Sequence, residues 1–251
     1  MKFRLDKLLV ERGLAPSRER AQALILAGRV LVDEQKLEKA GVNVNEDVTI
    51  RILGDDLPYV SRGGLKLAHA LEHWRIDVSR KTCLDIGAST GGFTDCLLQA
   101  GAARVMAVDT GYGQMDARLR SDPRVRLLEK TNARYLTAEQ LWGSDRPQPI
   151  AVVAVDVSFI SATLVLPAMV RCVGASSREW ELVVLVKPQF EVGRAQVGKS
   201  GVVRNAGAQQ MAVAKVSHAV EELGGLKIEA IESPILGAEG NREFLLHAAF
   251  R

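Results

Sequence analysis

Leu84-Asp85-Ile86-Gly87-Ala88-Ser89-Thr90-Gly91-Gly92-Phe93-Thr94-Asp95 is an apolar run that continues into a glycine-rich turn and then into a helical pattern. A strand followed by such a turn and a helix is typical of the start of a nucleotide-binding α/β fold. Further along, Val105-Met106-Ala107-Val108-Asp109 predicts a second buried strand that ends in a carboxylate. Such folds bind the ribose diol of a cofactor at that position.

The spacing of the glycines indicates the cofactor class. Gly87 is followed by Gly91 and Gly92, which is not the G-x-G-x-x-G spacing that lets a pyrophosphate approach a helix N-terminus. The carboxylate of Asp85 would also repel a pyrophosphate. S-adenosylmethionine has a sulfonium and an amino group but no phosphate, so an acidic turn favours it. The alternative is an ordinary turn between a strand and a helix, without a ligand.

Composition limits the class of protein. The chain has 251 residues, of which 47% are hydrophobic and 25% charged, enough for one large domain and a small one. The N-terminal residues lack the apolar segment of a signal peptide, and the apolar stretch 160–170 contains Pro167 and is too short for a membrane span. We therefore expect a cytoplasmic protein without a membrane partner. The odd number and wide spacing of the cysteines predict neither a disulfide framework nor a metal site: Cys83, Cys96 and Cys172.

Charge is unevenly distributed at the N-terminus. Residues 1–29 contain seven basic and three acidic side chains, whereas residues 30–58 contain three basic and seven acidic ones. Leu5, Leu8 and Leu9 predict a helix that ends near Gly13, and a second helix is expected from Pro16-Ser17 to a stop at Gly28. Alternating valines and isoleucines in 30–32, 42–44 and 48–52 predict short strands. A polarised small domain of this kind suits binding to phosphates.

This region resembles the S-four-type RNA-binding domain through "RLDKLLVERGL" (4–14) and "SRERAQALILAGRVLVD" (17–33). The family usually has glycine in the tight turn after the first strand, where this chain has Asp33-Glu34-Gln35. The alternative interpretation of the charges is a solvated helix face. In the family, the two helices present basic side chains to the RNA backbone, so the resemblance implies these contacts: Arg4, Lys7, Ser17, Arg18 and Arg29.

A short linker, 53–58, precedes the large domain, which gives expected domains 1–58 and 59–251. Strands are predicted at 82–86, 104–108, 124–128, 150–155, 181–186, 227–233 and 242–250, alternating with helical segments. The last two strands are separated by Pro234–Gly240 and predict a hairpin. The expected fold is a Rossmann-like doubly wound α/β sheet with one antiparallel strand, preceded by a small α+β domain.

Charged side chains follow two of these strands. Asp156 follows the strand 152–155 and Lys187 follows the strand 182–186. Ligands of doubly wound sheets bind beyond the carboxyl ends of the strands, so both groups should face one cleft. A lysine must lose its proton to act as a base, and a carboxylate such as Asp156 is suited to orient it. Lys66 and Glu243 are candidates for the same cleft, although charged residues also end strands simply because strands end in solvent.

The chain as a whole resembles the TlyA branch of the FtsJ-like RNA ribose 2′-O-methyltransferases, which join an S-four-type module to a methyltransferase domain. The matching segments are "YVSRGGLKL" (59–67), "LDIGASTGGFTD" (84–95), "VDTGYGQ" (108–114), "DVSFIS" (156–161), "VLVKPQFE" (184–191) and "GNREF" (240–244). The resemblance implies a catalytic set of Lys66, Asp156, Lys187 and Glu243, with Lys187 as the proton acceptor. It implies methylation of ribose on a cytidine of ribosomal RNA, most often in the large subunit. The residues expected around S-adenosylmethionine are Asp85, Gly87, Ser89, Gly91, Asp109 and Asn132.

A glycine-rich segment near residue 200 resembles a second nucleotide-binding motif. Gly193–Ser200 matches the phosphate-loop pattern G-x-x-x-x-G-K-S, but 187–192 separate it from the strand, and the glycines at 201 and 207 are a poor helix start. We interpret it as a mobile basic loop beside the active site that contacts RNA. An NTP-binding enzyme, a membrane-lytic protein and a non-catalytic RNA-binding protein are the alternatives.

Overall fold

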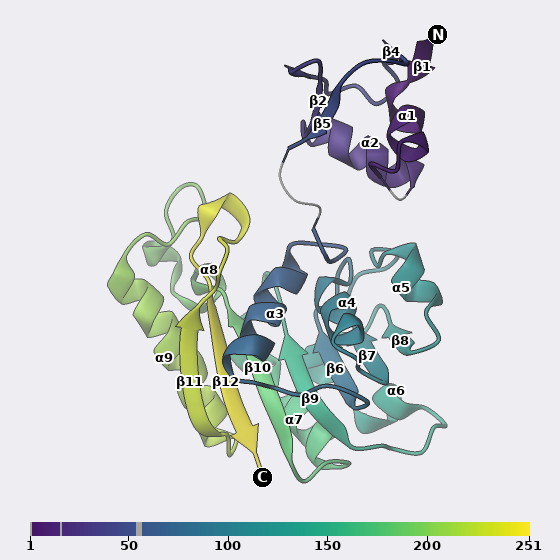
Figure 1. The fold of residues 1–251 in the computed structure, drawn as a ribbon. Coiled ribbons are helices and arrows are strands. Elements are labelled where there is room, and N and C mark those ends of the chain that lie inside the picture. The colour runs from purple at the N-terminus through teal and green to yellow at the C-terminus, as the bar shows by residue number, and fades with distance from the viewer. Residues whose placement is uncertain (1, 16, 54–56) are drawn as a thin grey trace. The chain divides into compact units, whose positions relative to one another are not determined.

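A computed structural model describes residues 2–15, 17–53 and 57–251. The chain divides into two compact units, Met1–Leu57 and Pro58–Arg251 (Figure 1). Each unit has its own hydrophobic core, and each is described here by itself.

The N-terminal unit packs two helices against short strands. Its elements are β1 (Lys2–Arg4), α1 (Leu5–Glu11), α2 (Arg18–Leu26), β2 (Val30–Val32), β3 (Gln35–Lys36), β4 (Asn43–Asn45) and β5 (Ile50–Ile52). β1 pairs with β4, while β3, β2 and β5 form a second small sheet. Both predicted helices are present, whereas β1 and β3 are additional to the prediction. The hydroxyl of Ser17 caps α2 by accepting from the backbone N–H of Arg20, and the predicted start at Pro16 lies outside the described residues.

The turn between β2 and β3 shows how the chain accommodates the missing glycine. Asp33 and Glu34 both adopt left-handed backbone conformations, with φ of 48° and 62°. Two central residues with positive φ are characteristic of the type I′ turn of a two-residue hairpin, which normally contains Asn-Gly or Asp-Gly. The Asp33 carboxylate accepts from the backbone N–H of Thr49 at 2.8 Å and thereby ties the turn to the segment before β5. The hairpin therefore forms at the cost of backbone strain at Glu34.

The large unit is built on one seven-stranded sheet in the order β11-β12-β10-β9-β6-β7-β8. Its strands are β6 (Thr82–Ile86), β7 (Arg104–Val108), β8 (Val125–Leu128), β9 (Ile150–Val155), β10 (Trp180–Val186), β11 (Leu226–Glu232) and β12 (Phe244–Phe250). β12 lies antiparallel to both β10 and β11, and the other pairs are parallel. The predicted doubly wound sheet with one reversed strand and a closing hairpin is thus confirmed.

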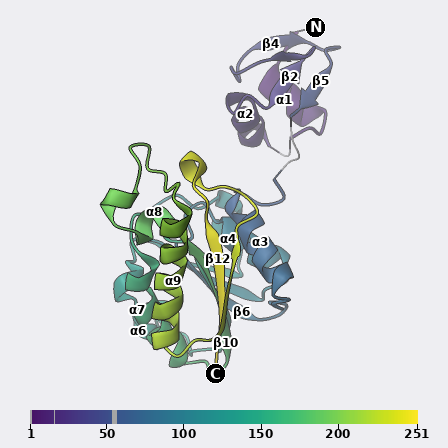
Figure 2. The same ribbon diagram turned by 90° about the vertical axis from the view of Figure 1, so that its left-hand side faces the viewer.

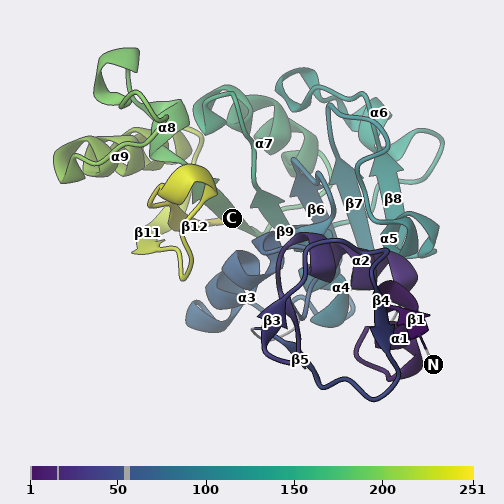
Figure 3. The same cartoon turned by 90° about the horizontal axis from the view of Figure 1, so that it is seen from above.

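Helices cover both faces of this sheet (Figures 2 and 3). One face packs against α3 (Gly63–His73), α4 (Gly92–Gln99) and α5 (Ala117–Ser121), and the other against α6 (Ala138–Trp142), α7 (Leu166–Gly174) and α9 (Ala206–Glu222). The four-residue helix α8 (Pro188–Glu191) follows β10 directly. Short 3-10 turns occupy Ala133–Tyr135, Ala162–Leu164, Arg194–Gln196 and Ala238–Gly240. Among the described residues, none of the helices has the length and apolar character needed to cross a membrane.

Candidate active site

The glycine-rich turn after β6 approaches the end of β9 closely. Gly87 has a φ of 89°, and a Cβ atom built on it would lie 2.3 Å from the carbonyl oxygen of Asp156. Gly91, the N-cap of α4, has a φ of 97°. Glycine is required at Gly87 for two reasons, because a side chain would be strained there and would collide with the backbone that follows β9. The turn and the carboxyl end of β9 therefore form the wall of one site.

A cavity of about 500 Å³ opens at this edge of the sheet. Gly87, Ser89, Asp109 and Asn132, four of the six residues predicted to bind a cofactor, line it together with Asp156. Its described lining includes two carboxylates and neither lysine nor arginine. Such a cavity suits a ligand with positive charge and no phosphate, because a pyrophosphate would face uncompensated negative charge.

Asp109, directly after β7, is oriented by two backbone donors. One carboxylate oxygen accepts from the N–H of Ser89 at 2.7 Å and the other accepts from the N–H of Gly111 at 2.6 Å. Each carboxylate oxygen has a second lone pair, so both can still accept from a ligand hydroxyl. Asn132 begins the 3-10 turn Ala133–Tyr135, where its side-chain oxygen accepts from the N–H of Arg134 at 3.0 Å.

Asp85 and Gly91 are outside the described lining of this cavity. The Asp85 side chain is fully buried in the layer between the sheet and α4, where the Thr94 hydroxyl donates to it at 2.6 Å. Burial, together with the charge of Asp156, raises the pKa of Asp85 to about 7. Its other carboxylate oxygen has no hydrogen-bond partner within the described residues. Asp85 is thus placed to hold α4 against β6 instead of facing the cavity.

Two lysine–carboxylate pairs stand at the same edge of the sheet. The ammonium of Lys187 lies 2.5 Å from the carboxylate of Asp156, and it donates to the Ser158 hydroxyl at 2.7 Å. Asp156 and Ser158 both line the cavity, so this pair opens onto it. The Lys187 side chain is only 11% exposed.

The second pair joins Lys66 of α3 to Glu243, just before β12. Their side chains are 10% and 3% exposed, so this ion pair is the more buried of the two. β10 and β12 pair with Val186 opposite Phe244, which places Lys187 and Glu243 next to each other on neighbouring strands. The antiparallel strand therefore brings a carboxylate to the carboxyl ends of the parallel strands. All four residues predicted as the catalytic set lie at this edge.

Two cavity residues were not predicted individually, although both lie in the "DVSFIS" segment. Ser158 accepts from Lys187, and Phe159 lines the cavity mouth. The Phe159 side chain is 93% exposed, and its φ is 64°. Its ring lies 5.4 Å from that of Phe190. An exposed aromatic ring on a left-handed backbone is unusual for a bulky residue.

In the N-terminal unit, a buried carboxylate organises part of the predicted RNA contact set. Asp6 is fully buried and accepts from Arg4 at 3.0 Å, from Arg18 at 2.9 Å and from Gln22 at 2.8 Å. The hydrogen bond from Arg4 holds the pKa of Asp6 well below its usual range. Arg4 and Arg18 are thus fixed side by side, each with nearly half of its side chain exposed.

The other three predicted RNA contacts are placed differently. Lys7 is exposed on α1, and Ser17 caps α2. Arg29 donates to the carbonyl of Leu53, so this contact lies near the C-terminal end of the unit. The structure brings Arg4 and Arg18 together on Asp6.

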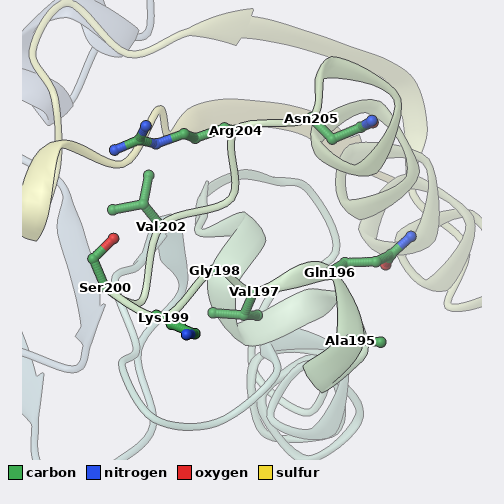
Figure 4. A pocket seen from close by; sticks show the side chains of 9 residues that line it. All are labelled: Ala195, Gln196, Val197, Gly198, Lys199, Ser200, Val202, Arg204 and Asn205. Atoms are coloured by element: carbon green, nitrogen blue, oxygen red, sulfur yellow. The ribbon is translucent and has the colours of Figure 1, made fainter.

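The segment Gly193–Ser200 does not have the geometry of a phosphate loop. After β10 come α8 and a 3-10 turn, and the next helix, α9, begins only at Ala206. Figure 4 shows a loop after the 3-10 turn, in which the N–H of Gly198 donates to the carbonyl of Val202 at 3.1 Å. A phosphate loop would connect a strand directly to a helix N-terminus. This arrangement is consistent with the prediction from the sequence that the segment is not an NTP-binding loop.

Comparisons with known proteins agree with the two-unit organisation. Residues 3–50 match the S4 domain, and residues 59–250 match the FtsJ-like methyltransferase family. The chain is 46% identical to the 16S/23S rRNA (cytidine-2′-O)-methyltransferase TlyA of Mycobacterium tuberculosis, over 97% of this chain and 88% of that protein. It is 38% identical to Hemolysin A of Brachyspira hyodysenteriae, over 98% and 99% of the two chains.

A solved structure of a hemolysin-labelled protein from Streptococcus thermophilus superposes with a TM-score of 0.75 at 38% identity, covering 99% of this chain and 88% of the other. The hemolysin name therefore occurs among relatives that share the complete two-unit architecture. The match to the methyltransferase family spans most of the chain, and it includes the glycine-rich turn, the acidic cavity and both lysine–carboxylate pairs. The chain belongs to the TlyA family, whose members combine an N-terminal S4 domain with an FtsJ-like methyltransferase domain.

Proposed function

We propose that this enzyme transfers a methyl group from S-adenosylmethionine to the 2′-hydroxyl of a cytidine ribose in ribosomal RNA. The observation that supports this most directly is the position of the Lys187–Asp156–Ser158 group, which opens onto an acidic cavity without a basic lining residue. A candidate base and a site for a cationic cofactor therefore meet at one edge of the sheet.

The cavity fits S-adenosylmethionine in charge and in chemistry. Asp109 has carboxylate oxygens oriented by two backbone donors, which would accept from a ribose diol, and Asn132 lines the same cavity and would bind the adenine edge. Val108, Ala133 and Val165 supply apolar wall for the purine ring. When bound, the cofactor supplies an electrophilic methyl carbon on a sulfonium. Of the remaining expected contacts, Gly87 and Ser89 line the cavity and would contact the methionine part, whereas Asp85 and Gly91 lie outside the described lining and would act by shaping the turn.

The residues of the chain then have separate tasks. Lys187, once it has lost its own proton, would accept the proton of the 2′-hydroxyl, and the bound cofactor would supply the methyl carbon to that oxygen. Asp156 and Ser158 hold the lysine in place and stabilise its protonated form. Lys66, paired with Glu243, holds the target nucleotide at the same edge. Positioning of the two reactants supplies much of the acceleration.

The RNA side of the proposal rests on two surfaces. The S4 domain presents Arg4 and Arg18, whose guanidinium groups are oriented by Asp6 and can bind backbone phosphates. Phe159 offers an exposed ring at the cavity mouth, where a nucleobase next to the reacting ribose can stack. The choice of cytidine and of ribosomal RNA follows the named activity of the relative from Mycobacterium tuberculosis.

The chemical outcome tests the proposal. A 2′-O-methyl group removes the nucleophile with which alkali cleaves the adjacent phosphodiester. Ribosomal subunits from cells that lack this protein are incubated with the purified enzyme and methyl-labelled cofactor, and the RNA is then digested with alkali. We expect the label in an alkali-resistant dinucleotide whose 5′ residue is cytidine, and no incorporation by Lys187→Ala. Label recovered in mononucleotides with a modified base would overturn the proposal.

A further inference from the structure

We infer that Glu191 is a positioning residue for the methyl transfer, and that with Lys215 it locks the "DVSFIS" loop (156–161) to the segment that presents Lys187. This inference rests on the proposed function. Glu191 lies four residues after Lys187, at the end of α8. Its side chain is 2% exposed, although it is a carboxylate outside the cavity lining. Burial of a charged group at this position requires a compensating set of contacts.

Both oxygens of the Glu191 carboxylate bind the loop that follows β9. One accepts from the backbone N–H of Ala162 at 2.7 Å, and the other accepts from the Ser161 hydroxyl at 2.5 Å. Ser161 also forms a hydrogen bond with the hydroxyl of Thr163 at 2.8 Å. The loop is thereby fastened at the point where it enters its 3-10 turn, two to four residues after Ser158 and Phe159.

Lys215 of α9 compensates the buried charge. Its ammonium donates to the Glu191 carboxylate at 3.1 Å and to the backbone carbonyl of the same residue at 2.9 Å. It also donates to the Ser161 hydroxyl at 3.2 Å. Three segments therefore meet in one network: the loop after β9, the helix α8 after β10, and the middle of α9.

The consequence for catalysis follows from the connectivity. Asp156 and Ser158 both contact Lys187, but they belong to a different strand end and could move away from it. Glu191 is connected to Lys187 by the single turn of α8. It also forms hydrogen bonds with the C-terminal end of the loop that contains Asp156 and Ser158. The neighbouring residue Phe190 contacts Phe159 from the same turn. The network therefore sets the distance between the candidate base and its partners, and a shift of about 1 Å in such a site can reduce turnover about 100-fold.

Four variants of the full-length enzyme separate positioning from stability: Glu191→Gln, Glu191→Asp, Lys215→Met and the double variant Glu191→Gln/Lys215→Met. Lys215→Met leaves a buried carboxylate without its cation and should lower the melting temperature. The double variant removes both charges, so its melting temperature should recover. Glu222→Gln, which removes an exposed partner of His218 on the same helix, is the matched control and should leave all readouts unchanged.

The measurements are kcat and KM for ribosomal subunits, Kd for S-adenosylmethionine, and amide hydrogen exchange in 157–163. We expect Glu191→Gln and the double variant to lose at least about tenfold in kcat, with Kd within twofold of wild type and faster exchange in the loop. Glu191→Asp keeps the charge on a shorter side chain and should regain part of kcat. If kcat of the double variant returned together with its melting temperature, the role of Glu191 would be structural only.

Failure of this inference and failure of the proposed function are distinguishable. A wild-type enzyme that does not methylate ribose would refute the proposed function, while the exchange measurement would still report whether Glu191 orders the loop. An active wild type with unchanged kcat and unchanged loop exchange in Glu191→Gln would refute the inference alone.

Discussion

In the proposed mechanism Asp109 binds the cofactor and Lys187 accepts the proton, and single substitutions should separate these two roles. Asp109→Ala removes the charged acceptor of the cofactor ribose and should weaken S-adenosylmethionine binding by about 1.5–3 kcal/mol, roughly 10- to 150-fold in Kd. Lys187→Ala should leave Kd nearly unchanged and abolish turnover, because Lys187 is outside the cavity lining. Isothermal titration calorimetry and single-turnover assays measure the two effects.

The control for this prediction addresses the backbone contacts of Asp109. Its carboxylate also accepts from Ser89 and Gly111, so Asp109→Ala could loosen the turn. A melting temperature close to that of wild type, measured without cofactor, would assign the loss to the ribose contact. Equal loss of cofactor binding in Asp109→Ala and Lys187→Ala would contradict the division of roles.

Asp85 should make the stability of the large unit depend on pH. Its folded pKa of about 7 is above the usual value of about 3.9 for an aspartate, so the native state holds a proton that the unfolded chain releases. The contribution of Asp85 to stability is then greatest below about pH 4, falls as pH rises toward 7, and is constant above both values. Asp85→Asn remains neutral and can still accept from Thr94, so it should remove this fall.

Thermal melts at pH 5 and pH 8 test this expectation. Relative to wild type, Asp85→Asn should have a melting temperature that is several degrees higher at pH 8 than the same comparison gives at pH 5. The size follows because one pKa unit corresponds to about 1.4 kcal/mol. Asp122→Asn is the control, because the hydrogen bond from Arg124 lowers the pKa of Asp122 and its contribution is constant over this range. Parallel melting curves for wild type and Asp85→Asn would show that Asp85 is not protonated in the native state.

At the scale of the element, the β2–β3 hairpin contains a strained backbone at Glu34 that a substitution can relieve. Glu34 adopts a φ of 62°, a conformation that costs a non-glycine residue about 1–2 kcal/mol. It also forms an exposed ion pair with Arg51, worth about 0–1 kcal/mol. Glu34→Gly removes both the strain and the ion pair, whereas Glu34→Ala removes only the ion pair.

The difference in stability between these two variants measures the cost of the left-handed backbone conformation at residue 34. We expect Glu34→Gly to be more stable than Glu34→Ala by about 1 kcal/mol, measured as slower amide exchange in 30–36 of the full-length protein. Equal exchange in both variants would mean that the hairpin tolerates the left-handed residue without cost.

For the whole molecule, the two units should divide substrate anchoring from chemistry. The core clusters of the large unit are built from its own residues, so removal of residues 1–57 should leave a folded domain that binds S-adenosylmethionine. Methylation of ribosomal subunits by this fragment should fall at physiological salt, because phosphate contacts fix the register of the protein on RNA. Activity assays against ionic strength should show a weaker salt dependence for the fragment. Equal activity of fragment and full chain would exclude the S4 domain as the anchor.

Much of this protein follows from local sequence patterns. Alternation of apolar runs and helical segments predicts the seven strands of the large sheet, and the glycines after Ile86 predict the turn at the cofactor cavity. The positions of Asp156 and Lys187 after their strands were sufficient to predict that they share a site. These features are local because they depend on residues that are neighbours in the sequence. They follow from strand and helix periodicity, from turn conformation and from the rule that ligands bind at strand ends.

Other features were decided only by tertiary packing. Both faces of β6 are covered, so its sequence contains no polar alternation to show that Asp85 points toward α4 instead of the cavity. Lys66 and Glu243 are 177 residues apart, and Ser161 and Glu191 are 30 apart. Sequence spacing carries no information on such contacts, because they depend on which helix packs on which strand and on the register of β12 against β10. The contacts of the buried Glu191 with Lys215 and Ser161 are therefore a property of the packed molecule, while the strand order along the chain and the glycine-rich turn belong to the sequence itself.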